Sequence, residues 1–471
     1  MAACFMRHGR KAWVNQVTVQ GDDQPAVRSG RWDPLRSVLR LAIPSAGELL
    51  LGMLVGLVNT YLVGHLGAAS LTAVGLSAHW VMIAMVVFSA VGTGATALIA
   101  RMVGAQERDT ANAVLAQALG IGLIMGVLAV VLLQVSAYPA LRLMGAEKEA
   151  LALGVPYLRL VSSVYVFSAV MFVGSACLRG AGDTRTPLLV MGLVNLTNVS
   201  VSWVLVNGSW GMPRLGVMGA AVGEMTARTI GCLLIIALLL RGRSGLSLRW
   251  SNCRYDRVLI RRILKIGYPA GIEQLVFRLG MLIFVRIVSA LGTVAFAAHQ
   301  VALNSESLSF MPGFGFAVAA TTLVGQGLGA RDEQRAERDG YIAFMLAAGL
   351  MSVMGVAFVL FARPIVGFFT SDPQVVEQGV LPLRLIGLVQ PFLAAMMVFA
   401  GALRGAGETL APMLINGGCV WLLRVPLALL FTRVMGWGLI GAWLAMALDI
   451  TIRGILLAVR FRRGKWKSIN V

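Results

Sequence analysis

Charged side chains are scarce in this 471-residue chain, because they make up 13% of it while 58% of the residues are hydrophobic. A soluble domain carries about 25% charged residues, with which it covers its surface. The composition therefore excludes an ordinary soluble enzyme or binding domain. It favours a protein whose apolar surface faces a lipid bilayer.

Histidine and cysteine are also rare, with 4 and 5 residues respectively. The histidines are spread over the chain, and the cysteines lack the spacing of a metal site. A membrane-embedded enzyme would need a cluster of such ligands near an interface. We therefore expect no metal centre, no organic cofactor and no enzymatic activity.

Acidic residues are outnumbered by basic ones, 21 to 40, which gives a formal net charge of +19. The basic residues lie mainly at the ends of apolar segments rather than on one folded face. That distribution is typical of contact with anionic membrane lipid, and it argues against nucleic acid as a partner.

Long apolar segments are what the chain has in abundance. One bilayer crossing takes about 20 apolar residues, and such segments recur about six times in each half. We predict helices near residues 38–64, 71–97, 111–137, 152–177, 186–206, 217–240, 263–289, 297–325, 338–362, 378–402, 411–431 and 439–460. The predicted fold class is an all-α integral membrane protein with about 12 transmembrane helices in two pseudo-symmetric six-helix bundles.

The two halves repeat one another. The sequence Leu-Arg-Gly-Ala-Gly occurs at residues 178–182 and again at 403–407, a shift of 404 − 179 = 225. The same shift relates two prolines and two glutamates, in the pairs Pro44/Pro269 and Glu48/Glu273. A constant offset over most of both halves indicates the duplication of a whole domain.

The repeat and the charges together divide the chain. We expect a cytoplasmic N-terminal extension, a first lobe, a basic cytoplasmic linker, a second lobe and a basic cytoplasmic tail, at residues 1–35, 36–240, 241–262, 263–460 and 461–471. Loops after the even-numbered helices carry further arginines, Arg179 and Arg404 among them, whereas the opposite loops are poor in them. The positive-inside rule therefore predicts both termini in the cytoplasm. Six helices per half give both halves the same orientation, about an axis along the membrane normal.

Residues 1–33 contain no apolar run long enough for a signal peptide, so we expect an uncleaved extension.

The two Leu-Arg-Gly-Ala-Gly segments lack the lysine and the spacing of a phosphate-binding loop. We interpret them as turns, with Asp183 and Glu408 as charges at helix N-termini. Transport is then expected to use an ion gradient rather than a nucleotide.

The sequence resembles the multidrug and toxic compound extrusion (MATE) transporters, whose larger group also holds lipid-linked oligosaccharide flippases. The matching motifs lie within residues 36–460, at 57–67, 178–182, 297–300, 311–315, 324–330 and 403–407. The resemblance implies two lobes around a central cavity, in a monomer of the inner cell membrane. It also implies export of drug-like, often cationic or amphipathic compounds in exchange for Na⁺ or H⁺. The alternative, a lipid-linked precursor flippase, would favour more helices and a strongly cationic cavity.

Ionisable residues inside the predicted helices are the candidates for ion coupling. A carboxylate at the bilayer centre costs at least about 2.5–3.5 kcal/mol, so it needs a partner or a function. Glu48 and Glu273 come first, since each lies four residues after a proline that we expect to bend its helix, Pro44 or Pro269. Burial would make such a carboxyl responsive to protons, and neighbouring oxygens could instead bind Na⁺. The alternative is a structural bond to a neighbouring helix or to the basic linker.

Two acids that the resemblance implies are absent from the first lobe. Their positions hold Asn59, fifteen residues after the first proline, and Ser202, four residues after Asn198. Together with Asn195 these residues form a polar, uncharged set, which can coordinate Na⁺ weakly but cannot exchange protons at physiological pH. Glu48 lies about three helical turns from Asn59 on the same face and is the candidate substitute.

The second lobe has four more ionisable candidates for the cavity: Arg278, His299, Glu306 and Arg424. The two arginines lie too deep to reach the membrane surface, so we expect ion pairs with Glu273, Glu306 or backbone carbonyls. His299 is a candidate proton switch. A structural role for all four is the alternative. We interpret two further pairs at helical spacing, Glu224/Arg228 and Asp449/Arg453, as structural.

Overall fold

The computed structural model describes residues 34–249 and 255–469, which contain helices and turns but no β-strand. The first lobe consists of α1 (Pro34–Gly64), α2 (Ala68–Gly104), α3 (Arg108–Leu143), α4 (Lys148–Ser163), α5 (Tyr165–Gly180), α6 (Arg185–Asn207), the short η1 (Ser209–Gly211) and α7 (Val217–Leu240).

The second lobe repeats this order. It consists of α8 (Arg257–Ser289), α9 (Thr293–Gly329), α10 (Glu333–Leu360), α11 (Ala362–Phe369), α12 (Pro373–Leu388), α13 (Gln390–Gly405), α14 (Leu410–Cys419), η3 (Val420–Arg424), α15 (Val425–Leu429), η4 (Leu430–Val434), α16 (Gly438–Arg462) and η5 (Lys465–Ser468).

In the described part of the chain, nine helical segments are long and apolar enough to cross a membrane, and two bent pairs bring the number to eleven. The remaining long helix, α8, has 33 residues but contains Glu273, Arg278 and Arg286, which lower its apolar character. With α8, the elements correspond to the twelve predicted helices, and the all-α membrane fold in two bundles is confirmed.

Two predicted helices are broken in the middle. The α4/α5 pair bends by 49° at Val164, and the α12/α13 pair bends by 54° at Val389. The breaks obey the repeat, since 389 − 164 = 225. Pro391 follows the second break and lacks the N–H that would continue the hydrogen-bonding ladder. No proline follows the first break, so packing within the lobe sets the bend there.

Helix α8 begins at Arg257, earlier than the predicted start at 263. Asp256 is the reason, because its carboxylate accepts hydrogen bonds from the backbone N–H groups of Val258 and Leu259 at 2.8 and 3.1 Å. An aspartate at this position satisfies N–H groups that have no partner within the helix. Part of the predicted linker is therefore helical.

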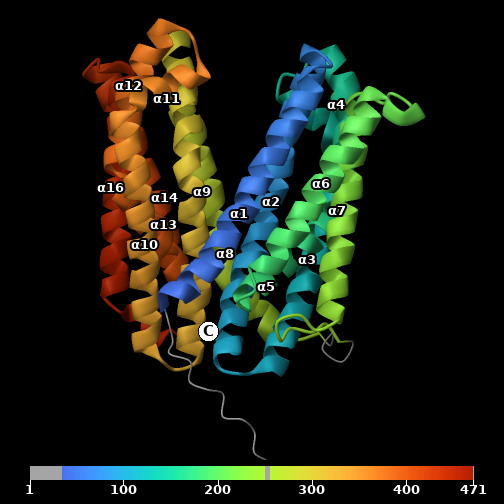
Figure 1. Cartoon of the computed structure of the whole chain (residues 1–471), viewed down its shortest axis with the longest axis vertical. Coiled ribbons are helices and arrows are strands. Elements are labelled where there is room, and N and C mark those ends of the chain that lie inside the picture. The colour runs from blue at the N-terminus through green and yellow to red at the C-terminus, as the bar shows by residue number, and fades with distance from the viewer. Residues whose placement is uncertain (1–33, 250–254, 470–471) are drawn as a thin grey trace, which may run out of the picture. The chain divides into compact units, whose positions relative to one another are not determined.

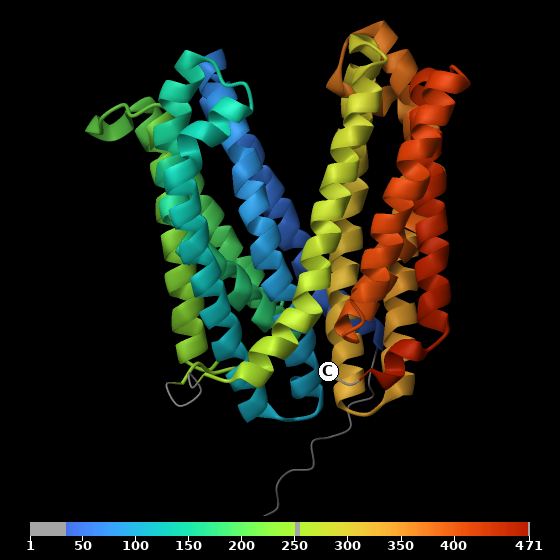
Figure 2. The same ribbon diagram turned by 180° about the vertical axis from the view of Figure 1, so that it is seen from behind.

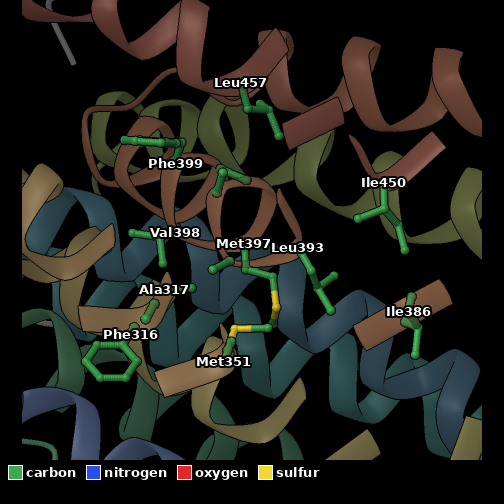
Figure 3. Packing of buried hydrophobic residues seen from close by; sticks show 14 of the residues in the cluster. Phe316, Ala317, Met351, Ile386, Leu393, Met397, Val398, Phe399, Ile450 and Leu457 are labelled. Atoms are coloured by element: carbon green, nitrogen blue, oxygen red, sulfur yellow. The ribbon is translucent and has the colours of Figure 1, made fainter. Parts of the chain in front are cut away.

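Each lobe has an apolar core that also includes the start of the other lobe's first helix, α1 in the second-lobe core and α8 in the first-lobe core. In the second lobe, Phe399 of α13 and Leu457 of α16 are buried in one cluster, as Figure 3 shows. The sulfur atoms of Met351 and Met397 lie near one another there, and both side chains pack over Gly313. Because lipid tails are as apolar as leucine, close packing of this kind holds helices together in a membrane.

The two lobes meet through contacts that themselves repeat. A methyl group on Gly267 would overlap the backbone of Ala90, and one on Gly315 would overlap that of Ala42. The 225 shift carries Ala42 onto Gly267 and Ala90 onto Gly315, so the α2–α8 and α1–α9 crossings are equivalent. Within residues 34–469 the two ribbons converge at the end that holds Arg241–Arg249 and diverge toward the other end (Figures 1 and 2).

Candidate transport cavity

A cavity of about 340 Å³ lies between the two lobes. Helices α2 and α5 line it from the first lobe, and α8, α9, α13, α14 and α16 line it from the second. Four phenylalanines supply apolar surface: Phe172, Phe277, Phe310 and Phe314. Small-molecule sites have about this volume and are mainly apolar with a few placed polar groups.

Two ion pairs flank this cavity, one in each lobe. Arg179 donates from Nη1 to Glu48 Oε1 and Oε2 at 2.8 and 3.1 Å, and Arg404 donates from Nη2 to Glu273 Oε1 at 2.6 Å. Both pairs span the same chain separation, because 179 − 48 = 131 and 404 − 273 = 131. Arg179, Arg404 and Glu273 line the cavity. The repeat therefore builds the same bridge twice.

The sequence predicts Arg179 and Arg404 in loops after even-numbered helices, and that prediction is wrong. They occupy the last turns of α5 and α13, with 15% and 24% of their side chains exposed. Their partners Glu48 and Glu273 were predicted to be site residues. In both halves the arginine follows the glutamate by 131 residues, and this constant separation could have predicted the two ion pairs from the sequence.

The prolines before the two glutamates are buried inside continuous helices. Pro44 has no N–H to donate to the carbonyl of Arg40, one turn earlier. Thr184 Oγ1 donates to that carbonyl instead, at 3.4 Å. The turn between α5 and α6 thereby stabilises the start of α1, close to Glu48.

The two glutamates differ in their remaining contacts. Glu273 Oε1 also accepts from Asn416 Nδ2 at 2.6 Å, whereas Glu273 Oε2 is buried without a partner among the described residues. The side-chain oxygen of Asn416 is buried and unpartnered there too. One carboxylate oxygen and one amide oxygen near the cavity are thus uncommitted.

The polar set of the first lobe lies away from these bridges. Asn195 donates to the carbonyl of Leu51 at 2.7 Å, and Asn198 donates to Glu224 Oε2 at 3.0 Å. Within the described chain, the oxygens of Asn59 Oδ1 and Ser202 Oγ are buried and unpartnered. None of the described cavity-lining residues belongs to this set. Its carboxylate comes from α7, where Glu224 forms the predicted pair with Arg228 at 2.8 Å.

In the second lobe Arg424 pairs with Asp449 at 2.8 Å, and Arg453 pairs with the same carboxylate at 2.6 Å. The expectation that Arg424 would pair with Glu273 or Glu306 is therefore wrong. Helix geometry explains this, because Arg424 ends the π-helical turn η3, directly before Val425 and Pro426. A π turn contains an extra residue and rotates the side chains that follow it.

The other second-lobe candidates have different surroundings. His299 is fully buried against Phe284 and Trp443, and its ring nitrogens have no partner in the described ranges. Arg278 contacts Met82 Sδ of α2 at 3.6 Å instead of an acid. Glu306 is buried and interacts electrostatically with Arg424 and Arg453.

Outside the membrane-spanning segments, Asp183 organises the turn between α5 and α6. It accepts hydrogen bonds from Ser244 Oγ at 2.6 Å and from the backbone and hydroxyl of Thr186 at 2.9 and 2.7 Å. Burial opposes ionisation of Asp183, but these hydrogen bonds together with Arg243 outweigh it and hold its pKa below the ordinary value. The repeat-related Glu408 pairs instead with Arg460 of α16.

Comparison with known proteins agrees with this architecture. The family model MatE matches the chain twice, over residues 44–204 and 269–430. The starting points of the matches differ by 269 − 44 = 225, the shift of the internal repeat.

Two curated relatives and one solved structure cover nearly the whole chain. A probable multidrug resistance protein NorM of Thermotoga maritima is 36% identical over 442 residues, which is 92% of this chain and 93% of that protein. A multidrug resistance protein NorM of Burkholderia vietnamiensis is 30% identical over 430 residues, or 90% and 92% of the two chains.

The solved structure is described as the outward-facing conformation of a multidrug resistance MATE family transporter of the MOP superfamily. It has a TM-score of 0.85 at 24% identity, covers 92% of this chain and 96% of that chain, and shares the fold. The double family match and the 36% identity over nearly the full length settle the family. The chain belongs to the multidrug and toxic compound extrusion (MATE) family of efflux transporters.

Proposed function

We propose that the protein exports small organic compounds across the inner cell membrane by alternating access, in exchange for Na⁺ or H⁺. The observation that carries this proposal is the cavity between two repeat-related lobes, with the buried carboxylate of Glu273 in its wall. The two NorM relatives are named for multidrug resistance, which supports drug-like substrates.

The lobe contacts support the alternating-access part of the proposal. Besides the Gly267 and Gly315 crossings, Gly104 packs on the backbone of Gln326, and Gly329 packs on that of Arg101. These contacts also obey the repeat, since 326 − 101 = 225 and 329 − 104 = 225. A symmetric set of glycine contacts at one end can separate when the lobes rotate and can re-form when they rotate back.

We propose Glu273 as the principal coupling residue. Its uncommitted Oε2 and the side-chain oxygen of Asn416 are suited to a proton or to Na⁺, which binds oxygen ligands. Glu48 is the secondary candidate, because both of its oxygens already accept from Arg179. The bound ion and the exported compound would then compete for Glu273, and such coupling between two ligands is reciprocal.

The proposed orientation places both termini and the 241–249 segment in the cytoplasm. In that orientation the two ribbons converge on the cytoplasmic side and diverge toward the outside, which supports our assignment of an outward-facing state. We propose that a monomer is the functional unit, since one chain supplies both walls of the cavity.

The test is efflux from proteoliposomes under a Na⁺ gradient or a H⁺ gradient, applied separately. We expect Glu273→Gln to abolish most gradient-driven efflux while folding and membrane insertion persist, and Glu48→Gln to do less. Transport at the wild-type rate by Glu273→Gln under both gradients would show that Glu273 is structural.

A further inference from the structure

The charges that face the cavity are mostly positive. Three arginines line it, Arg179, Arg404 and Arg453, whereas Glu273 is the one carboxylate among the described lining residues. Glu48 and Asp449, the partners of Arg179 and Arg453, are not among those residues. In these two pairs, therefore, the arginine contributes to the cavity wall and the acid does not.

The two repeat-related arginines keep hydrogen-bonding capacity after pairing. Arg179 uses only Nη1 for Glu48, and Arg404 uses only Nη2 for Glu273. The remaining guanidinium nitrogens of both have no protein acceptor among the described residues. A guanidinium presents several donors in a planar fork that matches a carboxylate, sulfonate or phosphate group.

Neighbouring groups would accept the rest of an amphipathic molecule. Arg179 lies over the ring of Phe172, with 6.0 Å from its guanidinium carbon to the ring centroid. Phe310, Phe314 and Met396 add apolar surface to the same cavity. An anion between Arg179 and Arg404 would contact one residue from each lobe, so its affinity would depend on how the lobes are placed.

From this arrangement we infer that the cavity recognises amphipathic compounds through an anionic group held by Arg179 and Arg404. The inference rests on the proposed transport function and specifies the substrate class. It differs from the cationic preference that the sequence resemblance implies. A carboxylate, a sulfonate or the head group of an anionic lipid shares the required chemistry.

Equilibrium binding to the purified protein in nanodiscs of zwitterionic lipid tests this without requiring transport. The probes are naphthalene-2-sulfonate and the matched cation 2-naphthyltrimethylammonium. A charge-assisted pair is worth about tenfold or more in affinity, so we expect the sulfonate to bind at least about tenfold tighter. Equal or tighter binding of the cation would overturn the inference.

Variants separate an arginine effect from misfolding. Glu48→Gln leaves Arg179 without a competing carboxylate, so we expect tighter sulfonate binding. The double variant Glu48→Gln/Arg179→Gln keeps the pair neutral and should lose about tenfold in affinity. Arg142→Gln removes an exposed positive charge at the end of α3, outside the cavity, and should leave binding unchanged. Unchanged sulfonate binding in the double variant would refute the assignment.

Two further arms complete the design. If anionic lipid in the nanodisc weakens sulfonate binding, and does so less in the double variant, the head group uses the same arginines. That result supports the shared chemistry and assigns its source to lipid. No effect of lipid assigns the site to free amphipathic anions. Anion-selective binding without gradient-driven efflux would refute the proposed transport function and leave only the anion-binding site standing. Gradient-driven efflux of cations that the double variant leaves unchanged would support the proposed function and refute the anionic substrate class.

Discussion

The glycine contacts between the lobes give a direct test of whether the end at which the lobes converge, near residues 241–249, must open during transport. Gly267 of α8 packs on Ala90, and Gly315 of α9 packs on Ala42, in both cases against main-chain atoms. Backbone cannot move aside as a flexible side chain can, so a methyl group at either glycine must push the helices apart. We therefore predict that Gly267→Ala and Gly315→Ala each destabilise the closed arrangement of this end.

The size of the effect follows from the cost of overpacking. Extra carbon in a tightly packed region costs about 1–3 kcal/mol, and about 1.4 kcal/mol changes an equilibrium tenfold. Each substitution should therefore shift the ratio of closed to open end by about 5-fold to 140-fold. The double variant should shift it further, because the two crossings are separate contacts.

The assay is labelling of single cysteines by a membrane-impermeant thiol reagent in a variant without the five native cysteines. A cysteine at Gln326, next to Gly104 at the closed end, should react faster in Gly267→Ala and Gly315→Ala than in the parent protein. Gly120→Ala and Gly349→Ala are matched controls, because an added methyl group there meets nothing within 4 Å. Equal labelling rates in all four variants would refute the claim that these contacts close the end.

Three further predictions come from other parts of the chain. Asn59→Asp places a carboxyl at a buried, unpartnered position of the first lobe, so we expect the pH profile of efflux to gain or shift a titration. Asp183→Asn should lower the melting temperature at pH 7. Because the pKa of Asp183 is held below the ordinary value of about 4, its ionised form stabilises the folded protein above that pH, and the difference from wild type should disappear as pH falls through the lower value. A reporter fused after Val471 should be active only in the cytoplasm, and activity of a periplasm-specific reporter would contradict the proposed topology.

Much of the fold could be predicted because the bilayer limits the possibilities. An apolar segment of the right length must form a helix, since every backbone polar group needs an internal partner in lipid. The internal repeat then fixed the number of bundles and their correspondence. The break at Val164 could not be predicted in the same way, because its neighbours contain no proline and the bend depends on contacts within the lobe.

The sequence predicted the acidic residues of the candidate site but not the arginines that pair with them. Glu48 and Glu273 were identified because a carboxylate inside an apolar helix is costly without a function or a partner. Arg179 and Arg404 sit at helix ends, where an arginine normally faces lipid head groups, and composition cannot show that they turn inward. The partner of Arg424 was missed because a π-helical turn changes which side of the helix it faces.

The repeat also explains why the two acids have different hydrogen-bond partners. The shift carries Glu48 onto Glu273 and Arg179 onto Arg404, but it carries Met191 onto Asn416. A methionine cannot donate the second hydrogen bond that Asn416 gives to Glu273, so the whole Glu48 carboxylate stays with Arg179. In the second lobe both donors gather on Oε1, which leaves Oε2 uncommitted. One substituted donor therefore distinguishes an acid with both oxygens in its ion pair from one with an unpartnered oxygen, which is the acid that we propose for ion exchange.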